Sequence, residues 1–337
     1  MNRDPVALSV AVLDVRPRGY PKECLQALVC APDTTGLPLN ALTVRPDIMR
    51  EALACDEVRQ AFPALRYTLL PQGTDVAQAK NLALTQSPSE YVLLLSSDVL
   101  VTSGCVAALR EFLVHHPKAA AASALLLREN GWPRPLGHQS PRLLAQCGRP
   151  LHWWRKVRPS LRRYPSLRLE RETQRRVEVL PFGCVLLRRR AWQDIGEYSE
   201  GYTFEFDEVE WAMRARRRGW RLYIVPPARA FHIAPQEMGN IPFPARLAFE
   251  ESLLRCVVRT HGNTYSSLFV ALRFARAVRL AIFCRAGWLL TGGCLMSLAR
   301  LSRDYAQLAR WFLRGQPANL SSTRECESML RWEAELL

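Results

Sequence analysis

Three short segments of the sequence carry side chains that could do metal or acid–base chemistry. Asp98 follows an apolar run and two serines, the cluster Asp207-Glu208-Val209-Glu210 opens a helical pattern, and His232 comes after a short apolar run. An aspartate and a histidine can bind a divalent cation whose other ligands are water and phosphate oxygens. A carboxylate can take a proton from a hydroxyl group. Together these residue types point to metal-assisted group transfer.

Each of these residues, considered alone, also has an ordinary structural explanation. An aspartate at the end of a strand often caps a turn, and acidic residues favour the first turn of a helix because of the helix dipole. A single histidine is more often structural than functional. Only the order and spacing of the three segments can decide between these alternatives.

The first 115 residues predict the elements that would position Asp98. Buried strands are predicted from β-rich apolar runs at 6–13, 39–44, 66–70 and 91–95. Helices are predicted between them at 22–31, 48–62 and 74–85. This alternation is typical of a doubly wound parallel sheet, in which ligands collect at the carboxyl ends of the strands. Asp14 and Asp98 both lie at such ends.

The rest of the chain divides into a loop, a second α/β stretch and a helical region. Residues 128–176 are rich in Pro, Arg and Trp and predict a long, variable basic loop. Strands are then predicted at 177–187 and 221–225, and helices at 189–195 and 209–218; the second strand is expected to stop at Pro226-Pro227. We expect a catalytic domain over 1–245, with halves at 1–115 and 116–245, and a helical basic region over 246–337.

Charge and cysteine content limit the class of protein. The net charge of +15 favours anionic partners such as phosphorylated small molecules, nucleic acid or an acidic membrane surface. Because no signature of a nucleic-acid-binding fold is present, we expect no nucleic acid partner. The ten cysteines show no zinc-binding spacing, and the first residues show no signal-peptide pattern. We therefore expect a cytoplasmic protein with reduced cysteines.

The order of four segments resembles that of the family 2 glycosyltransferases, which are inverting enzymes with the GT-A fold, and especially their rhamnosyltransferase-like bacterial branch. The segments lie between residues 6 and 235 and are 73–84, 90–101, 181–200, and 206–211 followed by 217–226 and His232. The resemblance implies an α/β protein with the GT-A (nucleotide-diphospho-sugar transferase) fold. Such a fold has a Rossmann-like, mostly parallel central sheet, here with a helical C-terminal extension.

The resemblance implies roles for four residues at the reaction centre. Glu208 occupies the place of the family's usual aspartate base, and Asp207 would support it or contact the acceptor. Asp98 would bind the metal and the donor diphosphate, with His232 as a further ligand, and the metal would be Mn²⁺ or Mg²⁺. The implied reaction is a single displacement with inversion. Asp98 and Glu208 are thus expected to meet across one cleft.

On the donor side, the resemblance implies that Asn81 helps to shape the pocket for a UDP-, dTDP- or GDP-linked sugar. Asp14 and Asp47, near the ends of the first two predicted strands, are candidates for contacts with the nucleotide. The sequence departs from the family pattern at three places. Ser96 stands two residues before the metal-binding aspartate, where the family usually has an acid. The first strand is followed by Val15-Arg16, whereas in the family it ends in Thr-Tyr-Asn. Residues 39–47 align poorly with the family's second strand.

The C-terminal region combines an apolar run with a basic helix. Residues 280–299 contain one charged residue, Arg285. The next segment predicts a helix with two separate arcs. One arc is basic and carries Arg300, Arg303, Arg310 and Arg314, and the other is apolar and carries Leu301, Tyr305, Leu308 and Phe312. Such a helix suits an anionic membrane surface. Three alternatives are open: a helix packed on the catalytic domain, interfacial attachment through 268–314, or a membrane span.

These observations predict a metal-dependent glycosyltransferase of cell-surface glycan or polysaccharide synthesis. Its acceptor would be a glycan, a lipid-linked sugar or a protein, and its location would be cytoplasmic, peripheral on the inner face of the cell membrane. Two alternatives remain open. Ser96 motivates a catalytically weak binding protein with the same fold, and the charge motivates a basic membrane-surface protein without transferase activity.

Overall fold

A computed structural model describes residues 8–15, 19–134, 175–203, 206–233 and 243–314. The chain divides into two compact units, one formed by residues 1–140 and 163–236 and the other by residues 141–162 and 237–337. Most of the predicted basic loop at 128–176 lies outside the described residues. The division of the chain at residue 245 stays a prediction.

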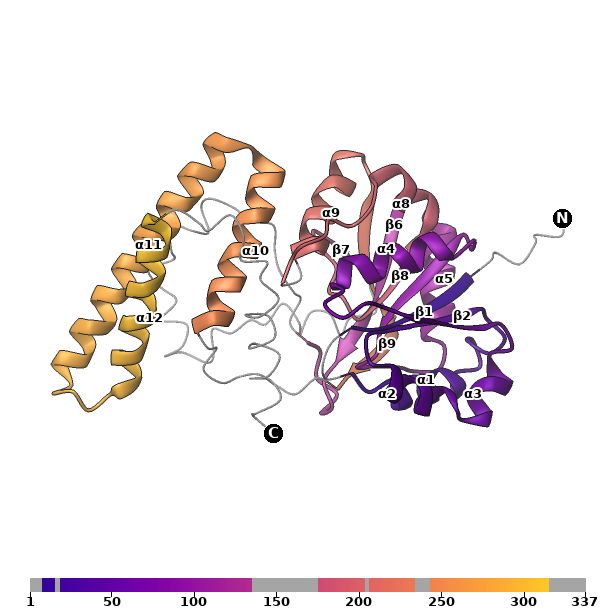
Figure 1. Cartoon of the computed structure of the whole chain (residues 1–337). Helices are drawn as coiled ribbons and strands as arrows, with labels where there is room; N and C mark the ends of the chain where they lie inside the picture. The colour runs from indigo at the N-terminus through magenta and orange to yellow at the C-terminus, as the bar shows by residue number, and fades with distance from the viewer. Residues whose placement is uncertain (1–7, 16–18, 135–174, 204–205, 234–242, 315–337) are drawn as a thin grey trace. The chain divides into compact units, whose positions relative to one another are not determined.

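The first unit is built on one mixed sheet, shown in Figure 1. Its described strands are β1 (Leu8–Asp14), β2 (Leu39–Thr43), β3 (Leu65–Leu69), β4 (Tyr91–Ser96), β5 (Val99–Val101), β6 (Ala119–Leu127), β7 (Arg175–Val177), β8 (Cys184–Arg188) and β9 (Arg221–His232). The order is β3-β2-β1-β4-β8-β6-β9-β5, with β7 beside β9. Among these strands only β5, β7 and β8 oppose the common direction. The predicted mostly parallel sheet is confirmed.

Helices cover both faces of this sheet. The main core lies under α1 (Pro21–Val29), α2 (Pro46–Leu53), α3 (Asp56–Ala61) and α5 (Cys105–His115). The other face carries α4 (Val76–Gln86), α8 (Arg189–Ile195) and α9 (Phe206–Arg217). Because both faces are covered, β1 and β4 are buried along their whole length, which explains their continuous apolar sequence.

Two predicted helix and strand boundaries are wrong in informative ways. The helix predicted at 48–62 is divided into α2 and α3, because Cys55 adopts an extended conformation. The strand predicted at 177–187 is divided into β7 and β8. In contrast, α4 begins as predicted, with Asp75 as N-cap and Gln78 closing a capping box.

The strand predicted to stop at Pro226-Pro227 instead continues to His232. In its pairing with β6, Val225 is followed by Arg229, so the residues between them lie at a break in the register. Proline has no N–H to donate and is tolerated at such a break. The continuation matters for the site because it brings His232 opposite Val99 of β5.

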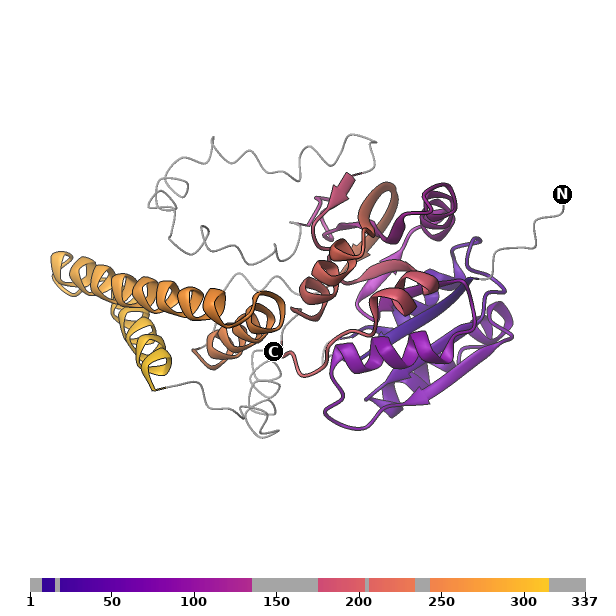
Figure 2. The same cartoon turned by 90° about the horizontal axis from the view of Figure 1, so that it is seen from above.

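In the second unit, the described residues form α10 (Phe243–His261), α11 (Asn263–Leu290) and α12 (Met296–Leu313). Helices α11 and α12 pack together as a hairpin (Figure 2). The apolar arc predicted on α12 is the packed side of this helix, since Leu308 and Phe312 are buried, while Arg300, Arg303, Arg310 and Arg314 are exposed. The predicted helical C-terminal region is confirmed. None of the described helices has both the length and the apolar character needed to span a membrane.

Candidate active site

Asp98 and His232 meet at the end of the sheet. Asp98 comes two residues after the last residue of β4, and the backbone N–H of Ile233 donates to the Asp98 carbonyl at 2.9 Å. Antiparallel pairing of β5 with the end of β9 then holds His232 beside Asp98. Nε2 of His232 lies 2.9 Å from Oδ2 of Asp98, within hydrogen-bond distance. Two residues that the sequence separates widely are therefore in contact, as expected.

The same pair has the donor atoms that a hard cation needs. Oδ1 of Asp98 and Nδ1 of His232 are buried and have no hydrogen-bond partner within the part of the chain that the structure describes. Buried polar atoms are normally hydrogen-bonded, so these two call for a further ligand. Among the described residues no cluster of three or more Asp, Glu, His or Cys side chains surrounds a metal position. A cation here would therefore need water and phosphate oxygens as well, as Mg²⁺ and Mn²⁺ commonly do.

Asp14 lies fully buried at the end of β1, where neighbouring donors occupy its carboxylate. The hydroxyls of Thr43 and Ser97 each donate to it at 2.7 Å, and Arg45 forms an ion pair with it. A Cβ atom on Gly19 would lie 2.0 Å from the Ser97 hydroxyl, so only glycine fits over this cluster. Asp14 thus ties together the ends of β1, β2 and β4. Its contact with a nucleotide stays a prediction.

The two other donor-side candidates lie in different surroundings. Asp47 is exposed in the first turn of α2, where a negative charge complements the helix dipole. Asn81 is buried on α4, where its amide donates to the Tyr198 carbonyl and its oxygen accepts from the Tyr198 backbone N–H, both at 2.8 Å. Asn81 therefore fixes the loop that carries Tyr198. Direct contacts of Asp47 and Asn81 with the donor stay predictions.

Asp207 and Glu208 share one buried cation, the ammonium group of Lys80. Lys80 Nζ lies 2.8 Å from Oδ2 of Asp207 and also pairs with Oε1 of Glu208. The exposed fractions are 1% for Lys80, 3% for Asp207 and 9% for Glu208. The rings of Phe182 and Tyr198 flank the ammonium group at 4.2 and 5.0 Å from their centroids. The cluster therefore combines one basic and two acidic side chains.

The surroundings of this cluster change its acid–base behaviour. Burial alone would lower the pKa of Lys80, but the charges and hydrogen bonds of Asp207 and Glu208 outweigh this effect and raise it. Burial, together with the charges of Glu208 and Asp207, raises the pKa of Tyr198 well above its ordinary value. Lys80 therefore stays protonated and Tyr198 stays neutral at physiological pH.

Glu208 borders a small cavity of about 20 Å³. Its lining is mostly apolar and consists of Lys80, Leu94, Leu180, Phe182, Val185, Tyr198, Glu208, Trp211 and Leu222. A space of this size holds about one water molecule. A hydroxyl group could therefore enter beside Glu208, whereas a whole sugar could not.

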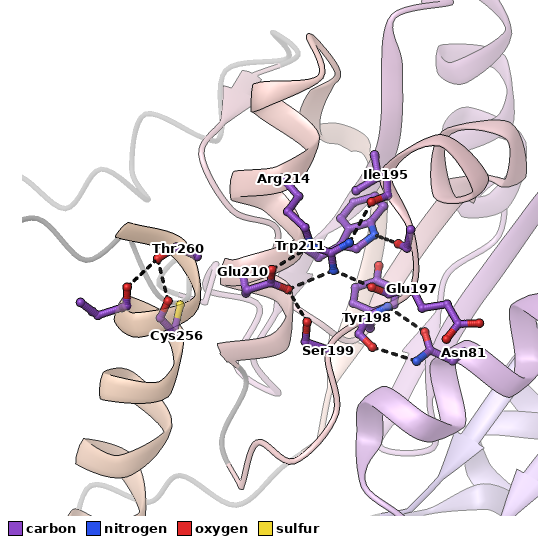
Figure 3. Close-up of polar contacts among 12 residues, drawn as sticks. Asn81, Ile195, Glu197, Tyr198, Ser199, Glu210, Trp211, Arg214, Cys256 and Thr260 are labelled. Carbon is purple, nitrogen blue, oxygen red and sulfur yellow. Dashed lines mark hydrogen bonds and ion pairs between the residues drawn. The ribbon is translucent and has the colours of Figure 1, made fainter. Parts of the chain in front are cut away.

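Helix α9 is held in place by side chains one turn after Glu208, as Figure 3 shows. Ser199 donates to Glu210 at 2.8 Å, and Arg214 bridges Glu210 and the Ile195 carbonyl, with both distances 2.8 Å. The indole N–H of Trp211 donates to the Gly196 carbonyl at 3.0 Å. Glu210 is thus a structural acid, unlike its neighbours Asp207 and Glu208, and it fixes the start of α9 against the loop at 195–200.

The two acidic sites lie near the same end of β4. The Lys80 ammonium group packs on Phe182, and the next residue, Gly183, accepts a hydrogen bond from the Ser96 N–H at 2.8 Å. Ser96 ends β4, two residues before Asp98. The base-side cluster and the Asp98 pair are thus joined through one short segment, and the meeting of Asp98 and Glu208 across one cleft stays a prediction.

Lys80 is the site residue that the sequence interpretation missed. A signal was available, because Lys80 lies three residues after Ala77 and four before Leu84, both on the buried face of α4. A lysine on such a face is almost never buried without a paired charge. The sequence could therefore have shown that Lys80 needs a carboxylate partner, although not which one.

Comparison with known proteins gives a family match and two curated relatives. Residues 51–196 match the family model described as Glycosyl transferase family 2. Over 246 residues the chain is 26% identical to the N-acetylglucosaminyl-diphospho-decaprenol L-rhamnosyltransferase of Mycobacterium tuberculosis, in strains CDC 1551 / Oshkosh and ATCC 25618 / H37Rv. The match covers 67% of this chain and 78% of each relative.

Solved structures show likeness in fold. The crystal structure of GalNAc-T7 with UDP, GalNAc and Mn²⁺ aligns with a TM-score of 0.52 and 13% identity, covering 91% of this chain and 56% of that one. The crystal structure of S. aureus TarS aligns with a TM-score of 0.45 and 14% identity, covering 79% of this chain and 42% of that one. The sheet topology and the alignment with GalNAc-T7 confirm the predicted fold class.

Proposed function

We propose that this protein transfers a sugar from a nucleotide-diphosphate donor to an acceptor hydroxyl with inversion. Its resemblance to the family 2 glycosyltransferases of the rhamnosyltransferase-like branch is confirmed by the family match and by the curated relatives. One observation carries the proposal. A buried carboxylate pair on α9 and the Asp98–His232 pair lie near the same end of β4. The reaction needs a carboxylate that removes the proton of the acceptor and a metal-binding pair that assists departure of the diphosphate, and it needs them close together.

Glu208 is the proposed general base. Its carboxylate borders a cavity that admits a hydroxyl group and pairs with Lys80, which holds it in place on α9. Glu208 takes the proton of the acceptor hydroxyl as the acceptor oxygen attacks the anomeric carbon and the bond to the diphosphate breaks. Asp207 shares Lys80 and so limits how strongly that cation holds Glu208.

Asp98 and His232 are the proposed ligands of Mn²⁺ or Mg²⁺. Their buried, unsatisfied atoms are chemically suited to such a cation. A divalent cation bound there would neutralise charge on the departing diphosphate. The catalytic arrangement would then consist of Glu208 on the acceptor side and Asp98 with His232 on the donor side.

We propose a lipid-linked acceptor. The M. tuberculosis relative is named for transfer of L-rhamnose to N-acetylglucosaminyl-diphospho-decaprenol, a lipid-linked diphosphate sugar. By this likeness the present chain would act in the synthesis of a cell-surface glycan, at the cytoplasmic face of the membrane. UDP-, dTDP- and GDP-sugars are all candidate donors.

A thermal-shift screen of UDP-, dTDP- and GDP-sugars with and without Mn²⁺ tests the donor side. Binding should raise the melting temperature by mass action, and only in the presence of the cation. Asp98→Asn should abolish the shift, whereas Asp56→Asn, the same chemical change at an exposed position that is not assigned to the donor site, should keep it. No shift with any donor, or an unchanged shift in Asp98→Asn, would refute the assignment.

A transfer assay with the donor that binds then separates an enzyme from a binding protein. Product formation with a lipid-linked acceptor supports transfer. Donor binding without product would favour the catalytically weak alternative, which is motivated by Ser96 at the place of the family's usual acid.

A further inference from the structure

The end of the α11–α12 hairpin carries a concentration of exposed apolar side chains. We call residues 282–296 the hairpin tip. Six of its large apolar residues are between 48% and 89% exposed, namely Ile282, Phe283, Leu289, Leu290, Leu295 and Met296. Contiguous exposed apolar surface in a folded protein usually marks a binding surface. The tip therefore needs a partner that can cover it.

Packing within the hairpin does not use these residues. Helix α12 buries Leu308 and Phe312, and the Ser302 hydroxyl donates to the Ala281 carbonyl at 2.9 Å. The turn itself is ordered by the Trp288 indole, which donates to the Gly293 carbonyl at 3.1 Å. The hairpin is thus a formed element whose apolar end points away from its own packing interface.

Arginines lie just behind the tip on both helices. Arg279 precedes Ile282 and Phe283 by three and four residues, and Arg300 follows Met296 by four, so each shares a helix face with tip residues. Both arginines are exposed. Four residues of helix span about 6 Å, which is close to the depth that an interfacial apolar surface reaches below lipid headgroups. With the apolar end inserted, the arginines would lie at the level of the headgroups.

The charge of this segment selects the kind of lipid. From Asn263 to Arg303 the chain contains six arginines and no aspartate or glutamate. The exposed members of this set are Arg279, Arg285, Arg300 and Arg303. Their positive charge is complementary to an anionic bilayer, where each basic side chain near the surface adds attraction.

We propose that the hairpin tip inserts into the surface of an anionic lipid bilayer and anchors the protein there. The anchor deepens the proposed function, since it would hold the enzyme where a lipid-linked acceptor resides. Lipid binding itself requires neither donor nor cation. It can therefore be tested apart from sugar transfer.

Flotation of the full chain with phosphatidylcholine vesicles, with or without phosphatidylglycerol, tests the anchor. The wild type should float with the mixed vesicles and less with the neutral ones. Phe283→Ser/Leu290→Ser should weaken partitioning about tenfold or more, which corresponds to about 1.4 kcal/mol or more, because two large apolar side chains no longer leave water. Val258→Ser/Leu268→Ser removes side chains outside the tip that are 49% and 52% exposed, and this variant should float like the wild type.

Charge and association provide the remaining readouts. Arg279→Gln/Arg300→Gln should reduce flotation with mixed vesicles and leave the weak binding to neutral vesicles unchanged. Equal flotation of wild type and tip variant would overturn the proposal. A wild type that does not float but forms a dimer, which the tip variant loses, would assign the tip to a second copy and also overturn it. Unchanged melting temperatures would show that all variants are folded, and failure of sugar transfer would leave these results unaffected.

Discussion

Replacing Lys80 by Met removes the cation from a site where two carboxylates are buried. The side chains of Lys80, Asp207 and Glu208 are 1%, 4% and 10% exposed, so bulk solvent screens the two carboxylates only weakly once the cation is lost. Removing one member of a buried ion pair costs about 3–5 kcal/mol of folding free energy. In urea, where the slope is about 1–3 kcal/mol per molar, this corresponds to a lower midpoint by about 1 M or more.

A matched set of variants separates the charge effect from loss of packing. Lys118→Met makes the same change at an exposed position and should alter the unfolding free energy by less than about 0.5 kcal/mol. Lys80→Met/Asp207→Asn/Glu208→Gln removes all three charges and should regain most of the stability lost in Lys80→Met. Urea unfolding followed by tryptophan fluorescence provides the measurement. A cost below about 1 kcal/mol for Lys80→Met, or no recovery in the triple variant, would refute the buried cluster.

Two further predictions concern Tyr198 and its support. Asn81→Ala leaves the backbone N–H and carbonyl of Tyr198 without their side-chain partner and should lower the unfolding free energy by about 1–3 kcal/mol in urea melts; an unchanged value would contradict the role of Asn81. Because the pKa values of Lys80 and Tyr198 are raised above 10.5 and 10.0, the folded state holds these protons more tightly than the unfolded state does. The stabilisation of the folded state by these two groups is complete below about pH 10 and is lost as the pH rises through the raised pKa values. The urea concentration at the unfolding midpoint should therefore decrease when the pH is raised above about 10, and it should decrease less in Tyr198→Phe. A midpoint that rises there would contradict the prediction.

The expectation that Asp98 and His232 share one site came from the family resemblance. Hydrophobic patterning predicts the strands, and because parallel strands end at one edge of a sheet, of these two residues it places only Asp98 at that edge. The prediction that the strand ends at Pro226-Pro227 was wrong. Proline disfavours a strand locally, but pairing with β6 and β5 extends β9 beyond the two prolines. The contact of His232 with Asp98 depends on that continuation.

The partners of Lys80 could not be predicted from sequence. Its burial follows from the helix pattern of α4, but its two carboxylates lie 127 and 128 residues away along the chain. Whether an acid in the first turn of α9 serves structure or chemistry depends on which neighbours reach it. Glu210 is bound by Arg214 and Ser199, whereas Glu208 borders a cavity, and the sequence does not distinguish them.

The basic helix was recognised from sequence, but its apolar face was assigned ambiguously. A helical pattern shows that one side is apolar and does not show what covers it. In the structure α12 packs through that side, and the exposed apolar residues lie at the hairpin tip.

The most direct test of the account is the turnover of Glu208→Gln with the donor and acceptor identified by the screens, measured beside donor affinity. Glutamine keeps the size of the side chain and cannot accept the proton. Loss of a general base should lower kcat by about 100-fold to 10,000-fold, while the variant stays folded and keeps its donor affinity. Turnover within a few-fold of the wild type would contradict Glu208 as the base.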